Sequence, residues 1–399
     1  RAHGAGQPLV SGGRGGAMGR AYRLISADGH VVEPPDMWTN YLPKKFHDRA
    51  PKLVKDTKGG DAWELAPGTP PMPLGLVTNA GPHGKRYEDL EWFGATYDTI
   101  LPGAFQGKAR LDEQDFDGVD CEVLFPSQRT MGAFMAQEDD DYHLAGLDAY
   151  NTWMRDEFMA ADPERLVGLA QMPGVDTPTA IKWLKDAKAA GFRGVIISAW
   201  PSGNEELSDE DDPFWQVAEE EEIPVHIHSG LRQAGKRGAG SFKAAAATMS
   251  RAIGLAEMGG PVGDASGFMS KLIYSGIYDR FPGLQMIAVE CGAGWIPHFL
   301  EHMDDHYWRN RTWTGTTLAL LPSDYFHRNW KVTFIREPFA VAVRHWIGVD
   351  NMMWSTDYPH HRHDWPYSRR IVEDSMAGVP MSERERMVCS NATELYRLG

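Results

Sequence analysis

The stretch IPVHIH, residues 223–228, is a short apolar run that ends on a histidine. Seven further runs of similar character occur along the chain, at residues 24–27, 119–125, 166–172, 194–198, 284–289, 332–335 and 352–356. Short apolar runs without strict alternation are typical of parallel strands that are buried on both faces. Helical segments separate most of these runs, as at residues 179–190, which follow Pro178 and stop before Gly191.

Eight strand-then-helix units predict an α/β protein with a closed parallel barrel, the (β/α)8 or TIM-barrel fold. The alternative is an open, doubly wound sheet. In the dinucleotide-binding form of that sheet, a glycine-rich phosphate loop follows the first strand, whereas Asp28-Gly29-His30 stands here. The sequence therefore favours the barrel.

The 399 residues fit a single barrel domain with insertions. We expect residues 1–17, rich in Gly, Arg and Ser, to be a tag or a disordered tail, and residues 18–399 to form the domain. Two long segments interrupt the alternation of strands and helices. They are residues 31–117 after the first strand and residues 230–267 after the fifth. In a barrel, such segments act as lids or as subunit contacts at the catalytic face.

The overall composition excludes several classes of function. A formal net charge of -15 disfavours nucleic acid as a partner, because such a surface repels phosphates. The three cysteines, Cys121, Cys291 and Cys389, are too widely spaced for a disulfide framework or a CxxC zinc motif, and they indicate the reducing cytoplasm. No apolar run approaches the ~20 residues that span a bilayer, so we expect no membrane association.

Ionisable side chains gather where the predicted strands end. They are Asp28, His30 and Glu33 at the first strand, His226 and His228 at the fifth, Glu290 at the sixth and Asp357 at the eighth. The carboxyl ends of barrel strands converge on one mouth. Mixed imidazole and carboxylate ligands suit Zn2+, Fe2+ or Mn2+. The sequence therefore predicts a divalent metal at this mouth, with its ligands among these residues.

Four blocks of sequence carry a resemblance to a known family. They are ADGHVVEP at 27–34, PVHIHSG at 224–230, FPGL at 281–284 with ECGAGWIP at 290–297, and WSTDYPH at 354–360. In this order they resemble the amidohydrolase-related family, in the branch that contains aminocarboxymuconate semialdehyde decarboxylase and the resorcylate-type decarboxylases. The resemblance spans residues 24–398. It implies a metal-dependent barrel enzyme, with Zn2+ as the metal expected first.

The resemblance also implies residue roles, with Asp28, His30, His228 and Asp357 as the ligands of the metal. Asp28 and His30 match the first-strand pair, where many members have His-x-His, and His228 matches the fifth-strand histidine ligand. Asp357 matches the eighth-strand aspartate, which binds metal and often assists proton transfer. Glu290 stands where the decarboxylases have a catalytic histidine, so this chain departs from the family at that position and offers a carboxylate as a catalytic group or ligand.

The expected activity is hydrolysis of a C–N or C–C bond, or decarboxylation, of a small carboxylated or amide-type substrate. In hydrolysis, Asp357 would act as general base while His360 steadies developing charge. In decarboxylation, Arg362 and the metal would hold the substrate carboxylate. His226 and Trp200 are further candidates for substrate contact.

A second hypothesis is a dinuclear non-haem iron or manganese oxygenase, or a subunit of one. The helix expected after the sixth strand carries His298, His302 and His306 at positions i, i+4 and i+8, so they share one face. Glu33, Glu290 and either His302 or His306 would supply the ligands of a second ion. The resemblance includes oxygenases of the 2-aminoisobutyrate-oxidising type. It also implies a homo-oligomer, or a hetero-oligomer with a related barrel subunit.

Overall fold

The computed structural model describes residues 20–78, 89–127, 130–135, 137–229 and 261–399. The tail predicted at residues 1–17 lies outside these described residues. Residues 230–260, most of the second predicted insertion, also lie outside them. Within the described part of the chain, none of the helices has the length and apolarity that a bilayer span requires.

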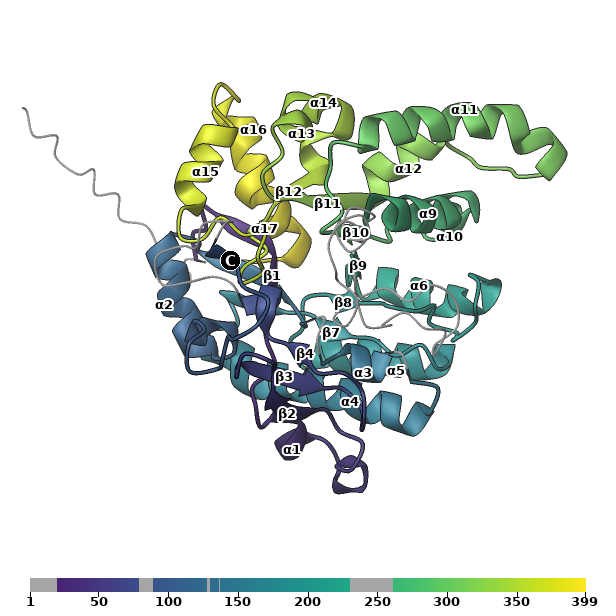
Figure 1. Ribbon diagram of the computed structural model, residues 1–399. Coiled ribbons are helices and arrows are strands. Elements are labelled where there is room, and N and C mark those ends of the chain that lie inside the picture. Colours follow the sequence, from purple (N-terminus) through teal and green to yellow (C-terminus); the bar gives the residue numbers. More distant parts are fainter. Residues whose placement is uncertain (1–19, 79–88, 128–129, 136, 230–260) are drawn as a thin grey trace, which may run out of the picture.

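Parallel strands form the ring at the centre of the molecule (Figure 1). They are β1 (Ile25–His30), β5 (Cys121–Phe125), β6 with β7 (Leu166–Gly168 and Ala170–Gln171), β8 (Val195–Ile196), β9 (Val225–His228), β10 (Met286–Val289), β11 (Trp330–Phe334) and β12 (Met352–Trp354). One sheet has the order β1-β5-β6 and the other the order β12-β11-β10-β9-β8-β7. Because β6 and β7 are separated only by Leu169, they join the two sheets.

The first and last strands meet at their carboxyl ends and complete the ring. A parallel bridge pairs Gly29 with Tyr358, and the His30 N–H donates to the Tyr358 carbonyl at 2.7 Å. The Asp357 N–H likewise donates to the Asp28 carbonyl at 2.9 Å. The barrel and the order of its eight strands are thus as predicted, but the strand bounds differ. The first strand, β1, continues to His30, and the third predicted strand is divided at Leu169 into β6 and β7.

Helices surround the ring on its outside (Figure 1). They are α2 (Gly107–Asp117), α4 (Asp140–Trp153), α5 (Thr177–Ala189), α6 (Asp212–Glu220), α9 (Pro261–Tyr274), α11 (Ile296–Thr314), α12 (Pro322–Asn329), α15 (Ser368–Ser375) and α17 (Asn391–Tyr396). Shorter helices are α1 (Met37–Tyr41), α3 (Gly132–Met135), α10 (Ile277–Arg280), α13 (Pro338–Ala342), α14 (Arg344–Ile347) and α16 (Met381–Glu385). The helix predicted at 179–190 begins two residues earlier, because Asp176 caps it by accepting the Thr179 N–H.

The segment predicted as an insertion, residues 31–117, contains a small antiparallel sheet. Its strands, β2 (Lys52–Lys55), β3 (Asp61–Glu64) and β4 (Met72–Pro73), pair in that order. The same segment ends with α2, which is the barrel helix between β1 and β5. This stretch therefore combines an added sheet with a regular part of the barrel.

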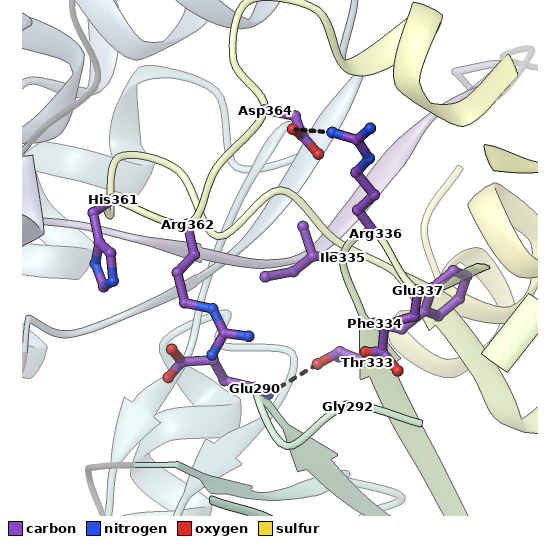
Figure 2. A pocket seen from close by; sticks show the side chains of 10 residues that line it. All are labelled: Glu290, Gly292, Thr333, Phe334, Ile335, Arg336, Glu337, His361, Arg362 and Asp364. Carbon is purple, nitrogen blue, oxygen red and sulfur yellow. Dashed lines mark hydrogen bonds and ion pairs between the residues drawn. The ribbon is translucent and has the colours of Figure 1, made fainter. Parts of the chain in front are cut away.

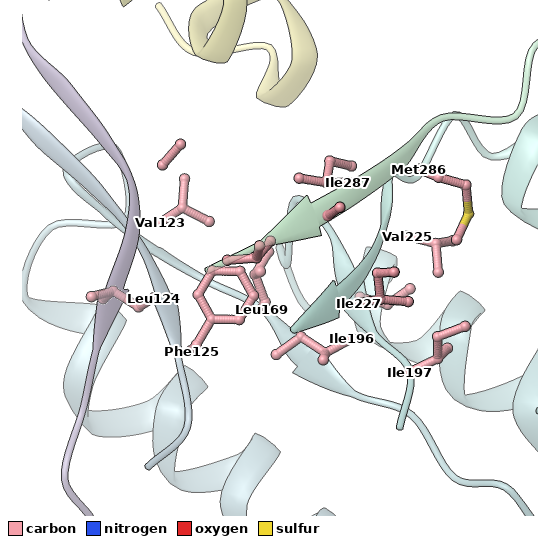
Figure 3. Close-up of a cluster of buried hydrophobic side chains, with 14 of the residues drawn as sticks. Val123, Leu124, Phe125, Leu169, Ile196, Ile197, Val225, Ile227, Met286 and Ile287 are labelled. Atoms are coloured by element: carbon pink, nitrogen blue, oxygen red, sulfur yellow. The ribbon is translucent and has the colours of Figure 1, made fainter. Parts of the chain in front are cut away.

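Apolar side chains from neighbouring strands pack together in the core (Figure 3). All four residues of β9 are buried, and its two histidines alternate with Val225 and Ile227 along the strand. The Phe125 ring lies 4.8 Å from the His228 ring and 5.7 Å from the His226 ring, measured between centroids. This aromatic packing places the two histidines of β9 inside the barrel.

Candidate metal centre

Four side chains from β1, β9 and the loop after β12 meet at the carboxyl end of the barrel. Asp28 Oδ1 lies 3.5 Å from His30 Nε2 and 3.4 Å from His228 Nε2. Asp357 Oδ1 lies 3.4 Å from His30 Nε2, and the two Nε2 atoms are 3.1 Å apart. All four side chains are buried. The structure thus brings together the four residues for which a shared metal was predicted.

The carboxylates of this cluster have no protein partner that satisfies them. Among the described residues, neither oxygen of Asp28 nor either oxygen of Asp357 accepts a hydrogen bond. Burial raises the pKa of Asp28 well above its usual value, and burial together with the charge of Asp28 does the same for Asp357. Leaving two buried carboxylates unpaired is costly, and a divalent cation between them offsets that cost. The donor set therefore fits a cation.

The two imidazoles are oriented by backbone carbonyls. His30 Nδ1 lies 3.1 Å from the Pro126 carbonyl, and His228 Nδ1 lies 2.5 Å from the Ser229 carbonyl. Burial lowers the pKa of His30 well below its usual value, and the nearby rings of His360 and His228 add to this effect. The His30 ring therefore presents its Nε2 to the centre in the neutral form that a metal requires, and the His228 ring also turns its Nε2 to the centre.

His360 lies at the edge of the cluster. Its ring stacks on that of His30 with centroids 3.8 Å apart, and its Nδ1 is 3.1 Å from Asp357 Oδ1. With His30 and Asp357 it forms a second trio of possible ligand groups, which overlaps the trio of Asp28, His30 and His228. His360 is thus placed to touch whatever the centre binds.

Two residues of the site have a left-handed backbone. The angle φ is 56° at both Glu290 and Asp357, a conformation that non-glycine residues rarely adopt. Such conformations persist where the surrounding structure imposes them, and they concentrate at functional sites. Here they turn the chain sharply where β10 and β12 end.

A cavity of about 320 Å³ adjoins the centre (Figure 2). It is lined by Glu290, Gly292, Thr333, Phe334, Ile335, Arg336, Glu337, His361, Arg362 and Asp364. Glu290 connects the cavity to the centre, because its Oε2 lies 3.7 Å from His228 Nδ1. That nitrogen is the one turned away from Asp28, so Glu290 stands beside the cluster and not among its four groups.

Arg362 is the basic group that faces this junction. Figure 2 shows its side chain extending towards Glu290 from the loop after β12. Burial and the charge of Asp357 raise the pKa of Glu290 well above its usual value, and the charge of Arg362 opposes that rise. The guanidinium makes no hydrogen bond or ion pair within the described ranges of the chain. Arg362 thus has its donors available for an anion.

Arg336, Glu337 and Asp364 line the cavity but were missed in the sequence. Arg336 and Glu337 follow β11 after a single residue, Ile335, much as Glu290 follows β10. The signal was therefore present, since the rule that polar residues at strand ends face the mouth applies to the seventh strand as well.

The structure corrects the expected role of Glu33. Its carboxylate is buried and accepts hydrogen bonds from the Ser127 hydroxyl at 2.5 Å and from the Ser127 N–H at 3.3 Å. Burial raises its pKa to about 7. Glu33 therefore holds the chain after β5 and does not join the cluster of metal-ligand groups.

The histidines of α11 are also not brought to the centre. His298, His302 and His306 are exposed, and the buried face of this helix carries Leu300 and Met303 instead. The shared helical face was predicted correctly, but it points to solvent. The extra ligands on which the dinuclear hypothesis depended are therefore not assembled.

His226 and Trp200 lie away from the cavity lining. His226 Nδ1 is 2.9 Å from the Val195 carbonyl and its Nε2 is 2.7 Å from the Tyr396 hydroxyl, so both nitrogens are engaged. Trp200 is buried and stacks on Phe268 with centroids 4.5 Å apart. Both residues pack the protein, and their predicted contact with substrate is not supported.

The fold and the sequence both match a known class of protein. Residues 102–398 match the family model described as Amidohydrolase, and the chain therefore belongs to this family. This confirms the resemblance noted in the sequence.

Particular relatives can also be named. The chain is similar to gamma-resorcylate decarboxylase of Polaromonas sp. (strain JS666), with 23% identity over 262 residues, which cover 61% of this chain and 74% of the relative. It is similar to decarboxylase orsB of Emericella nidulans, with 27% identity over 206 residues, covering 50% and 60%.

Solved structures show the same fold. The amidohydrolase map2389c of Mycobacterium avium subsp. paratuberculosis K-10 superposes with a TM-score of 0.74 at 18% identity, covering 94% of this chain and 99% of that one. The 5-carboxyvanillate decarboxylase LigW of Sphingomonas paucimobilis gives 0.63 at 21% identity, covering 95% and 100%. The predicted (β/α)8 barrel is confirmed by this likeness.

Proposed function

We propose that this protein is a metal-dependent decarboxylase of a small aromatic carboxylic acid, with its metal held by Asp28, His30, His228 and Asp357. One observation carries the proposal. The buried carboxylates of Asp28 and Asp357 accept no hydrogen bond among the described residues. One oxygen of each lies 3.4–3.5 Å from an imidazole Nε2, and the two Nε2 atoms are 3.1 Å apart. A divalent cation satisfies all of these groups together.

The similar proteins support both the reaction and the kind of metal. The curated relatives are decarboxylases by name. A dihydroxybenzoic acid decarboxylase from Polaromonas sp. JS666 and a 5-carboxyvanillate decarboxylase from Novosphingobium aromaticivorans were solved with bound manganese. We therefore propose that the single metal is Mn2+ or the Zn2+ that was expected from the sequence.

The cavity supports a single-ring acid as substrate. Its volume of about 320 Å³ is at the lower end of the range for small-molecule sites. Arg362 offers a planar pair of N–H donors that matches a carboxylate. When bound, the cation supplies a positive charge that stabilises an anionic group beside the cavity. Arg362 and His360 then orient the acid from the loop after β12.

Glu290 is the group best placed to complete the reaction. When the bond between the ring carbon and the carboxylate breaks, CO2 leaves and its electron pair stays on the ring carbon, which must then take up a proton. Glu290 lines the cavity, and its raised pKa favours the protonated form that can donate. It would do so where the decarboxylases that this chain resembles use a histidine.

Hydrolysis is a second candidate function, and the carboxylate at Glu290 is the observation that favours it. In its ionised form this group would take a proton from an attacking water, as would Asp357. The product distinguishes the two reactions, because only decarboxylation releases CO2.

The proposal is tested on the purified full chain. We expect one equivalent of Mn2+ or Zn2+ per chain by elemental analysis, and CO2 release from a panel of hydroxybenzoic acids. The variants Asp28→Asn and His228→Ala should lose the metal and the activity together. Full metal content in either variant would overturn the assignment of ligands.

Substrate binding is tested with a matched pair of variants. Arg362→Gln should raise KM by about 10-fold to 100-fold, since a charged hydrogen bond contributes about 1.5–3 kcal/mol. Arg336→Gln should change KM less, because Arg336 lines the same cavity but is half exposed and faces Asp364 at 3.9 Å. Equal effects of the two substitutions would contradict the role given to Arg362.

A further inference from the structure

A buried ion pair lies beneath the candidate metal centre. Arg110 of α2 donates from Nε to Glu122 Oε2 at 2.6 Å and from Nη2 to Glu122 Oε1 at 3.4 Å. The exposed fractions of the two side chains are only 1% and 3%. Because desolvation of both charges is expensive, such a pair contributes little stability by itself. Its retention in the core calls for another explanation.

The remaining donors of Arg110 bind backbone carbonyls next to the proposed ligands. Nη1 donates to the His30 carbonyl at 3.1 Å and to the Gly103 carbonyl at 3.0 Å. Nη2 donates to the Tyr358 carbonyl at 3.1 Å, and the guanidinium lies over the Tyr358 ring at 4.3 Å. One side chain therefore connects the end of β1 with the residue that follows Asp357.

Glu122 extends the same network to the other side. It accepts hydrogen bonds from the Gln114 amide at 2.7 Å and from the Thr356 hydroxyl at 3.4 Å. The Thr356 hydroxyl lies 3.0 Å from the Ser26 hydroxyl, which donates to the Asp28 carbonyl at 2.8 Å. The network thus reaches the backbone of Asp28 as well as that of His30.

The pair also packs against the glycine between two of the proposed ligands. A Cβ atom on Gly29 would lie 3.1 Å from Glu122 Oε1 and 3.2 Å from Arg110 Nη2, tighter than ordinary van der Waals contact. The absence of a side chain at Gly29 therefore allows the ion pair to approach the Asp28-Gly29-His30 backbone closely.

From these contacts we infer that Arg110 and Glu122 are positioning residues, which fix the ends of β1 and β12 so that Asp28, His30 and Asp357 reach one ion. The inference rests on the proposed metal centre. Its physical basis is that Asp357 has a left-handed backbone and lies more than 300 residues from Asp28, so local structure alone does not align them. The fork of an arginine binds two chain segments at once, which a lysine ammonium does less rigidly.

The first experiment compares the full chain with Arg110→Lys, which keeps the positive charge but loses the planar fork. We expect the dissociation constant for Mn2+, measured by calorimetry, to rise by about 10-fold to 100-fold, the usual effect of losing a group that orients metal ligands. The visible absorption spectrum of the Co2+-loaded variant should also differ from that of the parent, because it reports ligand geometry.

Asn329→Ala provides a matched control for loss of stability. The Asn329 amide is buried and donates to the carbonyls of Pro282 at 2.9 Å and Leu284 at 2.8 Å, bracing the backbone at the opposite end of the barrel. This variant should lower the melting temperature while leaving the Mn2+ affinity and the Co2+ spectrum unchanged. A merely structural role for Arg110 predicts that Arg110→Lys behaves in the same way.

A second variant keeps the test decisive if Arg110→Lys does not fold. Gly29→Ala removes no hydrogen-bonding group, but its added Cβ would contact Glu122 and Arg110 too closely and displace them. It should therefore also raise the dissociation constant for Mn2+. Parent-like Mn2+ affinity and Co2+ spectra in the folded variants would overturn the inference while leaving the metal centre intact. Failure of the unaltered chain to bind Mn2+ or Co2+ would instead overturn the proposed function.

Discussion

At the scale of single residues, the site is a balance between carboxylates that repel one another and groups that oppose their charge. The charge of Asp28 raises the pKa of Asp357, and the charges of both raise the pKa of Glu290, the third carboxylate beside them. Arg362 is the one positive charge that opposes all three, within the described part of the chain. This imbalance is what makes a divalent cation chemically appropriate here.

The sequence predicted some of these residues and not others, for a physical reason. The position of a residue at a strand end places its backbone at the mouth of the barrel, and this is why Asp28, His30, His228 and Asp357 meet. It does not determine which hydrogen bond a side chain makes. Glu33 turns to Ser127 and His226 turns to Tyr396, partners that the sequence alone does not reveal.

Glu33 should make stability depend on pH. Its pKa is raised from the usual 4.5 to about 7, so the folded protein keeps this proton to a higher pH than the unfolded chain. The stability it contributes is full below pH 4.5 and is lost as the pH rises through about 7, a difference on the order of 3 kcal/mol.

The measurement is denaturant unfolding of the parent and Glu33→Gln between pH 4.5 and 8. The variant should become progressively more stable relative to the parent as the pH rises. Glu301→Gln, on the exposed face of α11, serves as the control and should show no such trend. A stability difference that does not vary with pH would show that Glu33 ionises normally.

Replacing Glu290 should separate chemistry from metal binding. Because Glu290 lies beside the four-group cluster, Glu290→Gln should leave the metal content unchanged while kcat falls by about 100-fold or more, the usual contribution of a general acid. Glu337→Gln alters the same cavity and should reduce kcat far less, since its carboxylate holds the N–H groups of Ala293 and Gly294. Steady-state kinetics and elemental analysis of both variants test this role. Equal losses of kcat in the two variants, or loss of metal from Glu290→Gln, would contradict it.

At the scale of elements, buried runs were easy to predict and exposed faces were not. The strands were found because each is an apolar run in a core that shields both faces. The small sheet β2-β3-β4 was not foreseen, because β2 (KLVK) and β3 (DAWE) each have only two apolar residues between charged ones, which is too short a pattern to indicate a strand. For α11, helical spacing showed that three histidines share a face, but spacing does not indicate which face packs inward.

The exposed face of α11 yields a prediction. Replacing His298, His302 and His306 together with glutamine should leave the metal content after dialysis and the kcat unchanged, because these side chains are exposed while the four-group cluster is buried. Surface substitutions of this kind usually change stability by less than about 0.5 kcal/mol. Loss of one metal equivalent in the triple variant would restore the dinuclear hypothesis.

At the scale of the whole molecule, the cluster joins strands from both sheets of the ring. Asp28 and His30 belong to β1, whereas His228 belongs to β9 and Asp357 follows β12. A ligand that binds these groups only in the folded state stabilises that state by mass action. Metal content should therefore control the stability of the entire barrel.

Thermal unfolding with and without metal tests this link. Mn2+ at 100 times its dissociation constant should stabilise the parent by about 2.7 kcal/mol, and a chelator should reverse the effect. Asp357→Asn should show little response to either addition. A parent whose melting temperature ignores both Mn2+ and chelator would contradict binding at this cluster.

The contact between the backbones of Asp28 and Asp357 also has a consequence for biosynthesis. After β1 leaves the ribosome, more than three hundred further amino acids must be added before Asp357 and Tyr358, which pair with one edge of β1, emerge from the exit tunnel. Until then, the first strand exposes an unpaired edge of the kind that chaperones cover. Metal loading of the nascent chain is therefore expected only near the end of translation, however early the other half of the barrel begins to fold.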